Sequence, residues 1–273
     1  MLDASLKEQL SSVFQQLSNN VDILYYHSNH ADQKDLLAML NDIATTSHNI
    51  TTKPYEGKFS DYPQFEIHSQ NYFQKNNTQE TGITFKGIPN GHEFTSLIIA
   101  ILNADGKGKF PDEGIISRIQ KIKGPIHLKT YISLTCENCP DVIQALNQMA
   151  VLHGNFTHEM IDGAYTQDEI EKLNIQGVPS VIHNGKLVHA GKISFIDLLE
   201  KVEKHFGIDE SQASSNESKD LGEFDVVVVG GGPAGASAAI YSARKGLSTV
   251  MIAEKFGGQV QDTKGIENLI SIP

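Results

Sequence analysis

Hydrophobic and polar residues alternate along this chain with two different periods, and the changes of period mark its elements. In residues 6–17 (LKEQLSSVFQQL) and 35–44 (DLLAMLNDIA), apolar side chains recur three and four positions apart, which predicts amphipathic helices. Shorter apolar or alternating runs, 21–26 (VDILYY) and 126–132 (IHLKTYI), predict strands. The chain therefore mixes helices and strands in alternation, which is typical of an α/β protein.

The same order of elements occurs twice between residues 5 and 206. Each copy runs through a helix, a strand, a second helix, a strand with an X-Pro step, a hairpin strand and a closing helix. The matching segments are 6–17 and 114–122, 21–26 and 126–132, 35–44 and 141–150, 61–67 (DYPQFEI) and 177–183 (GVPSVIH), and 93–102 and 194–206. This repeat predicts two related domains, 1–103 and 104–206. Residues 166–175 (TQDEIEKLNI) predict an additional helix in the second copy alone.

The composition changes after the second copy. Residues 208–223 are rich in Ser, Asp and Glu and lack a periodic pattern, so we expect a flexible linker over 207–223. The segment 224–273 opens with an apolar strand, the glycines Gly230, Gly232 and Gly235, a helix, and a second strand that ends at Glu254. Glycines allow a close approach to a pyrophosphate, the helix start supplies amide donors, and an acid suits a ribose hydroxyl. This pattern predicts the start of a Rossmann-like dinucleotide-binding domain.

Charge and hydropathy exclude several functions. The chain has 22 Lys and Arg against 33 Asp and Glu, a net charge of −11, which disfavours binding to nucleic acid or to anionic lipid. Its first twenty residues lack the basic and apolar regions of a signal peptide, and apolar runs such as 97–102 are too short to span a bilayer. We expect a cytoplasmic protein with no nucleic-acid or membrane partner.

The chain has only two cysteines, Cys136 and Cys139, and they form one Cys-x-x-Cys between a predicted strand and a predicted helix. A cysteine at a helix start faces free amides and the positive end of the helix dipole, which lowers its pKa toward 7 or below and favours the reactive thiolate. Cys136 is therefore the candidate nucleophile and Cys139 the candidate resolving thiol. A zinc half-site is disfavoured because no other cysteine is present, and a structural disulfide because so short a loop adds little stability, so we expect no metal.

The first copy lacks this chemistry. Aligning Tyr25 with Tyr131 places His30 and Gln33 where the second copy has its cysteines, so the first copy cannot perform dithiol exchange. His30 is either a catalytic base or a solvated loop histidine, and the second interpretation is favoured.

The Cys-x-x-Cys and the Val178-Pro179 step resemble those of thioredoxins and glutaredoxins, which implies two tandem thioredoxin-like folds with a cis proline beside the active site. The whole chain resembles the flavoprotein components of alkyl hydroperoxide reductases, a family of flavin-dependent peroxiredoxin reductases. The resemblance rests most specifically on 91–97 (GHEFTSL), 133–147 (SLTCENCPDVIQALN), 177–181 (GVPSV), 228–246 (VVGGGPAGASAAIYSARKG) and 256–268 (FGGQVQDTKGIEN).

This resemblance implies an enzyme, a disulfide oxidoreductase in which electrons run from NADH to FAD, to a second Cys-x-x-Cys, to the dithiol here, and to the disulfide of a partner peroxiredoxin. It implies that Cys136 attacks that disulfide, that Cys139 resolves the intermediate, that Glu93 assists proton transfer, and that Pro179 borders the site. It also implies a homodimer when the protein is full-length, and FAD contacts at Gly230, Gly232, Pro233, Ala234, Gly235, Glu254, Gly258 and Gln259.

The flavoprotein segment, 224–273, is short for this family. We expect a truncated chain that lacks the second cysteine pair and the NADH domain, holds FAD weakly, and takes electrons only from an added reductant or reductase. Two other functions stay open: a general thioredoxin-like reductase or isomerase arm fused to a flavoprotein, and a binding module whose thiols are incidental.

Overall fold

The computed structural model describes residues 2–69, 80–209, 221–253 and 257. The chain divides into two compact units, residues 1–214 and 215–273. Most of the predicted linker falls outside the described residues. Within the described part of the chain, no helix is long and apolar enough to cross a membrane.

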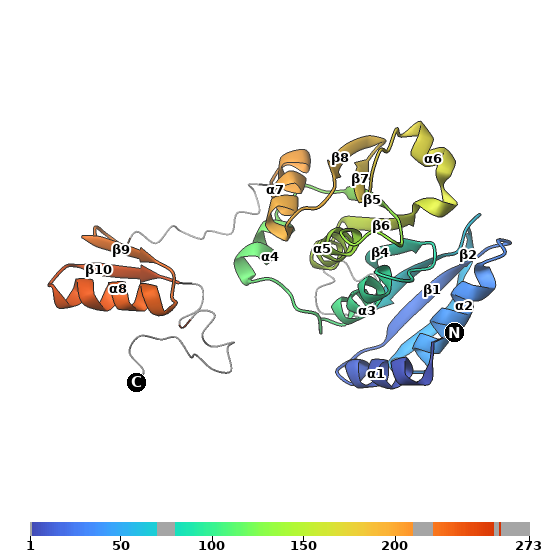
Figure 1. Cartoon of the computed structure of the whole chain (residues 1–273), viewed down its shortest axis with the longest axis horizontal. Coiled ribbons are helices and arrows are strands. Elements are labelled where there is room, and N and C mark those ends of the chain that lie inside the picture. Colours follow the sequence, from blue (N-terminus) through green and yellow to red (C-terminus); the bar gives the residue numbers. More distant parts are fainter. Residues whose placement is uncertain (1, 70–79, 210–220, 254–256, 258–273) are drawn as a thin grey trace. The chain divides into compact units, whose positions relative to one another are not determined.

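The first unit contains both predicted copies (Figure 1). The first copy consists of α1 (Ala4–Phe14), β1 (Val21–His27), α2 (Gln33–Ala44), β2 (Ile50–Phe59), β3 (Gln64–Ser69), β4 (Glu80–Lys86) and α3 (Glu93–Ala104). The second consists of α4 (Glu113–Gln120), β5 (Ile126–Ile132), α5 (Cys139–Leu152), β6 (Phe156–Asp162), the 3-10 helix η1 (Gly163–Tyr165), α6 (Gln167–Lys172), β7 (Ser180–His183), β8 (Lys186–Ala190) and α7 (Phe195–Phe206). The repetition and the additional helix α6 are confirmed, and each copy contains one strand that the predicted order lacked, β2 in the first and β6 in the second.

Local sequence explains several boundaries. The side chain of Asp3 accepts a hydrogen bond from the amide of Leu6 and caps α1, and Ser194 caps α7 in the same way through Asp197. Strands β7 and β8 are joined by Asn184-Gly185, both with positive φ (49° and 74°), which is the turn that a two-residue hairpin requires.

Eight strands of the first unit form one continuous sheet in the order β2-β1-β3-β4-β6-β5-β7-β8. Each copy contributes four strands in the same relative order, and the two sets meet where β4 pairs with β6 in parallel, from Ile83 opposite His158 to Lys86 opposite Ile161. Gly82 lies at this seam with φ +77°, and an added β-carbon there would lie 2.2 Å from the carbonyl oxygen of Phe156. The two copies are therefore halves of one sheet.

The main core lies between this sheet and the helices of both copies. It includes Phe14, Leu36 and Leu40 from the first copy, and Leu146 and Met149 from the second. Helix α3 of the first copy packs against α5 of the second, so this core also crosses the seam. The additional helix α6 covers a separate small cluster formed by Tyr131, Ile161 and Ile182. Because side chains alternate between the faces of a strand, this cluster lies on the face opposite the main core.

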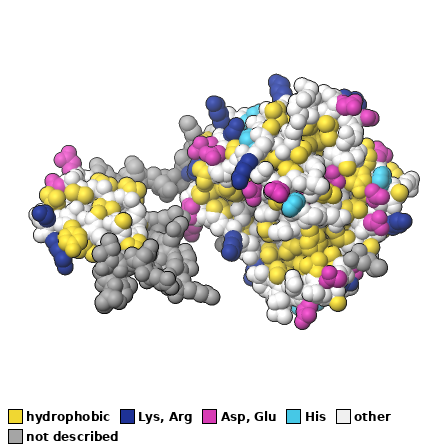
Figure 2. Space-filling model, viewed as in Figure 1, with side chains coloured by type: hydrophobic (Ala, Val, Ile, Leu, Met, Phe, Trp, Pro, Cys, Tyr) yellow, Lys and Arg dark blue, Asp and Glu magenta, His cyan; other side chains and the backbone are white. Residues whose placement is uncertain are grey.

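The described part of the second unit contains β9 (Val226–Val229), α8 (Pro233–Arg244) and β10 (Thr249–Ile252), with the two strands parallel. Its hydrophobic side chains reach the surface (Figure 2). Val229 is 81% exposed and Tyr241 64% exposed, because one strand pair and one helix cannot enclose a core.

Candidate active site

The sheet topology brings four loops to one edge. Strand β1 is antiparallel to β3, β3 is antiparallel to β4, and β4 runs parallel to β6 and β5. Strands β1, β4, β5 and β6 therefore all end at the same edge. The segments that follow these strands contain His30 and Cys136 in loops, Glu93 at the start of α3 and Tyr165 at the end of η1.

The two cysteines are bonded to each other in a disulfide, with their Cα atoms 5.5 Å apart. Cys136 is partly exposed, whereas Cys139 is fully buried in the main core. Helix α5 begins at Cys139, with Pro140 in its first turn, so Cys136 lies in the turn that precedes the helix and not in the helix itself. A partner can approach only the outer sulfur, and the inner sulfur is placed to displace it afterwards.

The Val178–Pro179 peptide bond is cis, as the sequence predicts. The Sγ atom of Cys136 lies 3.8 Å from the carbonyl oxygen of Val178, so this loop borders the outer sulfur. Tyr62–Pro63, which has the same place in the first copy, is not among the cis bonds of the described residues, which are Val178–Pro179 and Gly124–Pro125.

Glu93 is the first residue of α3 and is fully buried. Burial raises the pKa of its carboxyl group from 4.5 to about 7, and the nearby Ser96 hydroxyl offsets only part of this rise. Neither carboxyl oxygen has a hydrogen-bond partner of good geometry. An added β-carbon at Gly91, two residues before Glu93, would lie 3.1 Å from the carbonyl oxygen of Leu134, so this loop reaches the loop that carries Cys136. Glu93 therefore offers a buried carboxyl group that can hold or release a proton near neutral pH, two residues after the point where these two loops meet.

The first copy preserves the position of the cysteines without their chemistry. Helix α2 begins at Gln33, as α5 begins at Cys139. The Gln33 side-chain amide donates to the carbonyl oxygen of Tyr26. The ring of His30 packs at 5.2 Å, edge to face, against the ring of Tyr165 from the second copy. His30 is therefore in contact with a neighbouring side chain, and Tyr165 is a residue that the sequence analysis did not identify.

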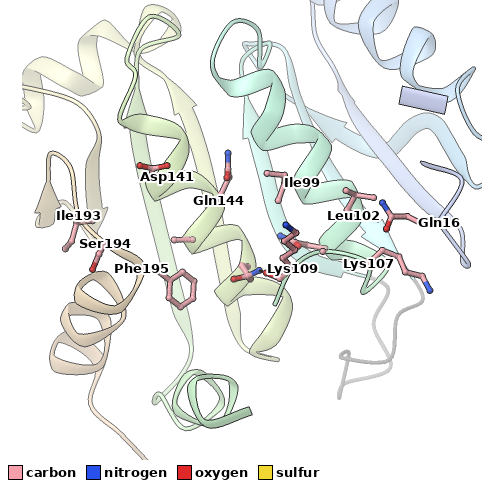
Figure 3. A pocket seen from close by; sticks show the side chains of 14 residues that line it. Gln16, Ile99, Leu102, Lys107, Lys109, Asp141, Gln144, Ile193, Ser194 and Phe195 are labelled. Carbon is pink, nitrogen blue, oxygen red and sulfur yellow. Dashed lines mark hydrogen bonds between the residues drawn. The ribbon is translucent and has the colours of Figure 1, made fainter. Parts of the chain in front are cut away.

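A cavity of about 690 Å³ lies between α3 and α5 (Figure 3). Ile99 and Leu102 of α3 face Asp141 and Gln144 of α5 across it, and Phe195 borders it at the start of α7. Asp141 stands in the first turn of α5, two residues after Cys139. Neither cysteine, Glu93 nor Pro179 lines this cavity. Among the described residues, no group of three or more His, Cys, Asp or Glu is arranged to hold a metal ion.

The glycine-rich turn fits a dinucleotide pyrophosphate. Gly230 follows β9 with φ +120°, and Gly232 precedes α8, whose first turn has no side-chain cap. Added β-carbons at Gly230 and Gly232 would meet nothing within 4 Å, so the backbone is open to a phosphate. At Gly235 a β-carbon would lie 2.0 Å from the carbonyl oxygen of Gly230, so this glycine is required for close helix-strand packing.

Pro233 and Ala234 form the first residues of α8 in this turn. The other predicted FAD contacts, Glu254, Gly258 and Gln259, lie outside the described residues.

Family models match two parts of the chain: a thioredoxin domain at residues 126–204 and an FAD-dependent oxidoreductase at residues 225–262. The chain is 41% identical to the alkyl hydroperoxide reductase AhpF of Staphylococcus aureus and 42% identical to that of Pseudomonas aeruginosa, each over 272 residues. It is 44% identical to a Bacillus subtilis protein named NADH dehydrogenase. In each case the match spans 100% of this chain and 50% of the relative, so the chain has about half their length.

Solved structures agree on the fold. The C503A mutant of the alkyl hydroperoxide reductase AhpF from Enterococcus faecalis superposes with a TM-score of 0.65 at 23% identity, covering 74% of this chain and 99% of that one. A protein disulfide oxidoreductase from Aeropyrum pernix superposes with a TM-score of 0.64 at 18% identity, covering 76% of this chain and 95% of that one. The predicted tandem thioredoxin-like fold, the start of an FAD-binding domain and the resemblance to the AhpF proteins are confirmed.

Proposed function

We propose that this chain, which resembles AhpF over its entire length, is the dithiol arm of a peroxiredoxin reductase. In this function it receives electrons from a flavoprotein and passes them to the disulfide of a partner peroxiredoxin, which detoxifies hydroperoxides. The observation that carries the proposal is the unequal exposure of the two sulfurs: Cys136 is open to a partner and Cys139 is buried behind it.

The proposed exchange has two steps that balance in electrons. The Cys136 thiolate attacks one sulfur of the partner's disulfide, forms a mixed disulfide and releases the partner's other sulfur as a thiolate. Cys139 then attacks Cys136 Sγ, forms the Cys136–Cys139 disulfide seen here, and releases the partner's second sulfur. The partner gains two electrons and this chain loses two. Pro179 borders the site and shapes the surface at which the partner's chain docks.

Glu93 moves the proton in this proposal. Cys139 is buried, so water cannot readily take the proton from its thiol. A carboxyl group with a pKa of about 7 is divided between its acid and its base form near neutral pH, so it can accept that proton before Cys139 attacks and return one to a leaving thiolate. An ordinary exposed glutamate would be fully ionised at the same pH and could only accept.

In this proposal the electrons come from an FAD held by the second unit. The glycine-rich turn at Gly230, Gly232 and Gly235, with Pro233 and Ala234, would hold the pyrophosphate of FAD. FAD, when bound, accepts hydride from NADH and passes electrons on to a disulfide. We also propose that the whole protein works in the cytoplasm, where thiols are kept reduced, and as a homodimer.

Thiol transfer tests the proposal directly. The full chain is reduced, freed of reductant and mixed with an oxidised peroxiredoxin, and the thiols of both proteins are counted by alkylation and mass spectrometry. We expect two thiols to appear on the peroxiredoxin for each chain oxidised. Cys136→Ser should abolish transfer, whereas Cys139→Ser should trap a mixed disulfide through Cys136. Unchanged transfer by Cys136→Ser would refute the proposal.

The second candidate function is a general disulfide reductase or isomerase, favoured by the likeness to the disulfide oxidoreductase fold. Insulin reduction separates the two functions. A peroxiredoxin reductase should reduce its peroxiredoxin far faster than insulin, and equal rates would favour the general function. A chain whose cysteines never cycle between dithiol and disulfide would instead be a docking module.

A further inference from the structure

Tyr165 of the second copy occupies the inactive site of the first copy. Its ring lies 5.2 Å from that of His30, which stands where the other copy has Cys136, and 6.1 Å from that of Tyr62, which precedes the counterpart of Pro179. Its hydroxyl group donates to the Oδ2 atom of Asp32 at 2.9 Å. One side chain therefore contacts, in the first copy, the counterparts of both loops that form the active site in the second copy.

The segment around Tyr165 makes a second contact across the seam. Glu169 of α6 accepts a hydrogen bond from the hydroxyl group of Tyr131 at 2.6 Å and lies 3.4 Å from the Nζ atom of Lys86, at the end of β4. Lys86 in turn lies 5.0 Å from the centre of the Tyr62 ring. The additional segment of the second copy thus holds the end of β4 from the side opposite the main core.

The backbone that follows β4 leads directly to the buried carboxyl group. Gly87 packs so closely under Tyr165 that an added β-carbon would lie 3.4 Å from its ring and 2.8 Å from the Cβ atom of Asp162. The Gly87 amide donates to the carbonyl oxygen of Pro63 at 2.7 Å. Further along the same loop the chain reaches Glu93, whose amide donates to the carbonyl oxygen of Asn90.

We propose that Tyr165 is a positioning residue for Glu93: by filling the inactive site of the first copy, it fixes Gly87 and holds the loop 88–92 over the dithiol. This proposal rests on the proton role proposed above for Glu93. In this proposal the inactive site has a structural function, because it binds a side chain of the active copy. The ring, which contacts Gly87, His30 and Tyr62, should matter more than the hydroxyl group, because the hydroxyl group contacts Asp32 and not the backbone that leads to Glu93.

The environment of Glu93 provides the readout. Burial dominates its raised pKa, so the pKa reports how tightly the loop excludes water. The titratable groups brought by the packed elements are the two cysteines and Asp141 of α5, and His92 stands beside Glu93 in the chain. Strand β3 presents Phe65 and Ile67 to the core. Keeping the cysteines in the disulfide removes their titration from the measurement.

The experiment follows the side-chain carboxyl carbon of Glu93 by carbon-13 NMR across pH, in the oxidised full chain labelled at glutamate, with Glu93→Gln to assign the signal. In the unaltered chain we expect a midpoint of about 7. Tyr165→Ala and Tyr165→Leu should lower this midpoint by about one pH unit or more, because water enters beside the loop. Tyr165→Phe keeps the ring and should keep the midpoint.

The matched control is Tyr26→Leu, which removes a tyrosine that donates to the carboxylate of Glu66 at 2.5 Å within the first copy. It should leave the Glu93 midpoint unchanged. An unchanged midpoint in both Tyr165→Ala and Tyr165→Leu, with folding verified by circular dichroism, would overturn the proposal, and so would an equal shift in Tyr26→Leu. No peroxiredoxin is present in this measurement, so its outcome is independent of the proposed partner. A shifted midpoint in a chain that fails to reduce peroxiredoxin would refute the function and leave the positioning intact.

Discussion

Replacing Glu93 by Gln should make the protein more stable at neutral pH, although the residue belongs to the proposed active site. The folded chain holds this carboxyl group at a pKa of about 7, against 4.5 for an exposed glutamate. Between these two pH values the folded chain retains a proton that the unfolded chain has released. The free energy of unfolding therefore falls as the pH rises through this range, and the full cost is present above pH 7.

The magnitude follows from the size of the shift. A difference of about 2.5 pH units at about 1.4 kcal/mol per unit corresponds to about 3 kcal/mol. Gln has nearly the shape of the protonated carboxyl group and does not ionise. We therefore expect the advantage of Glu93→Gln over the unaltered chain to grow by about 3 kcal/mol between about pH 4.5 and about pH 8.

Urea unfolding of the oxidised chain at a series of pH values measures this gain. The chain has no tryptophan, so the transition is followed by far-ultraviolet circular dichroism. At each pH, the free energy of unfolding of the unaltered chain is subtracted from that of the variant, which cancels the contribution of all other titrating groups. Glu8→Gln, at an exposed position of α1, serves as the control and should give a constant difference. The reasoning is wrong if the Glu93→Gln difference is equally constant with pH.

Three further predictions concern packing and protonation elsewhere. Gly82→Ala should lower the free energy of unfolding of the first unit by at least about 2 kcal/mol more than Gly57→Ala does, as measured by urea unfolding. Both glycines have positive φ, but only at Gly82 would the added β-carbon lie 2.2 Å from a backbone oxygen. His158 is fully buried, and burial lowers its pKa to about 3. As the pH falls from 6.5 to 3, the free energy of unfolding should therefore decrease by about 1.4 kcal/mol per pH unit. His158→Gln should remove this slope, as measured by urea unfolding at a series of acid pH values. In the second unit, Gly235→Ala should disturb the packing of α8 on β9 and Gly232→Ala should not, which hydrogen exchange of the β9 amides would detect.

Much of the fold could be predicted because the relevant signals are local. The strand 126–132 has the predicted bounds, since apolar and polar residues alternate over its first half and its last two residues are apolar. Strand β2 was not delimited, because Pro54 and Gly57 lie within it and read as a turn. Such residues are tolerated there because β2 is an edge strand of the sheet.

The contents of the site were predicted less completely, for a physical reason. The cysteine pair, the cis proline and Glu93 all stand in short motifs. Tyr165 meets Asp32 across 133 positions of sequence, and no local pattern links them. The pairing of β4 with β6 was missed in the same way, because parallel strands from different copies carry no turn between them to show that they are neighbours.

The seam between β4 and β6 also limits how the protein can be divided. Cutting the chain between the two copies would expose the unpaired backbone groups of β4 in one fragment and of β6 in the other. Exposed strand edges invite pairing with other chains, so the separated halves would be prone to aggregate even with every motif intact. The copy without thiols thus supplies the neighbouring strand for the copy that has them, and we expect each copy to need a covered sheet edge if it is produced alone.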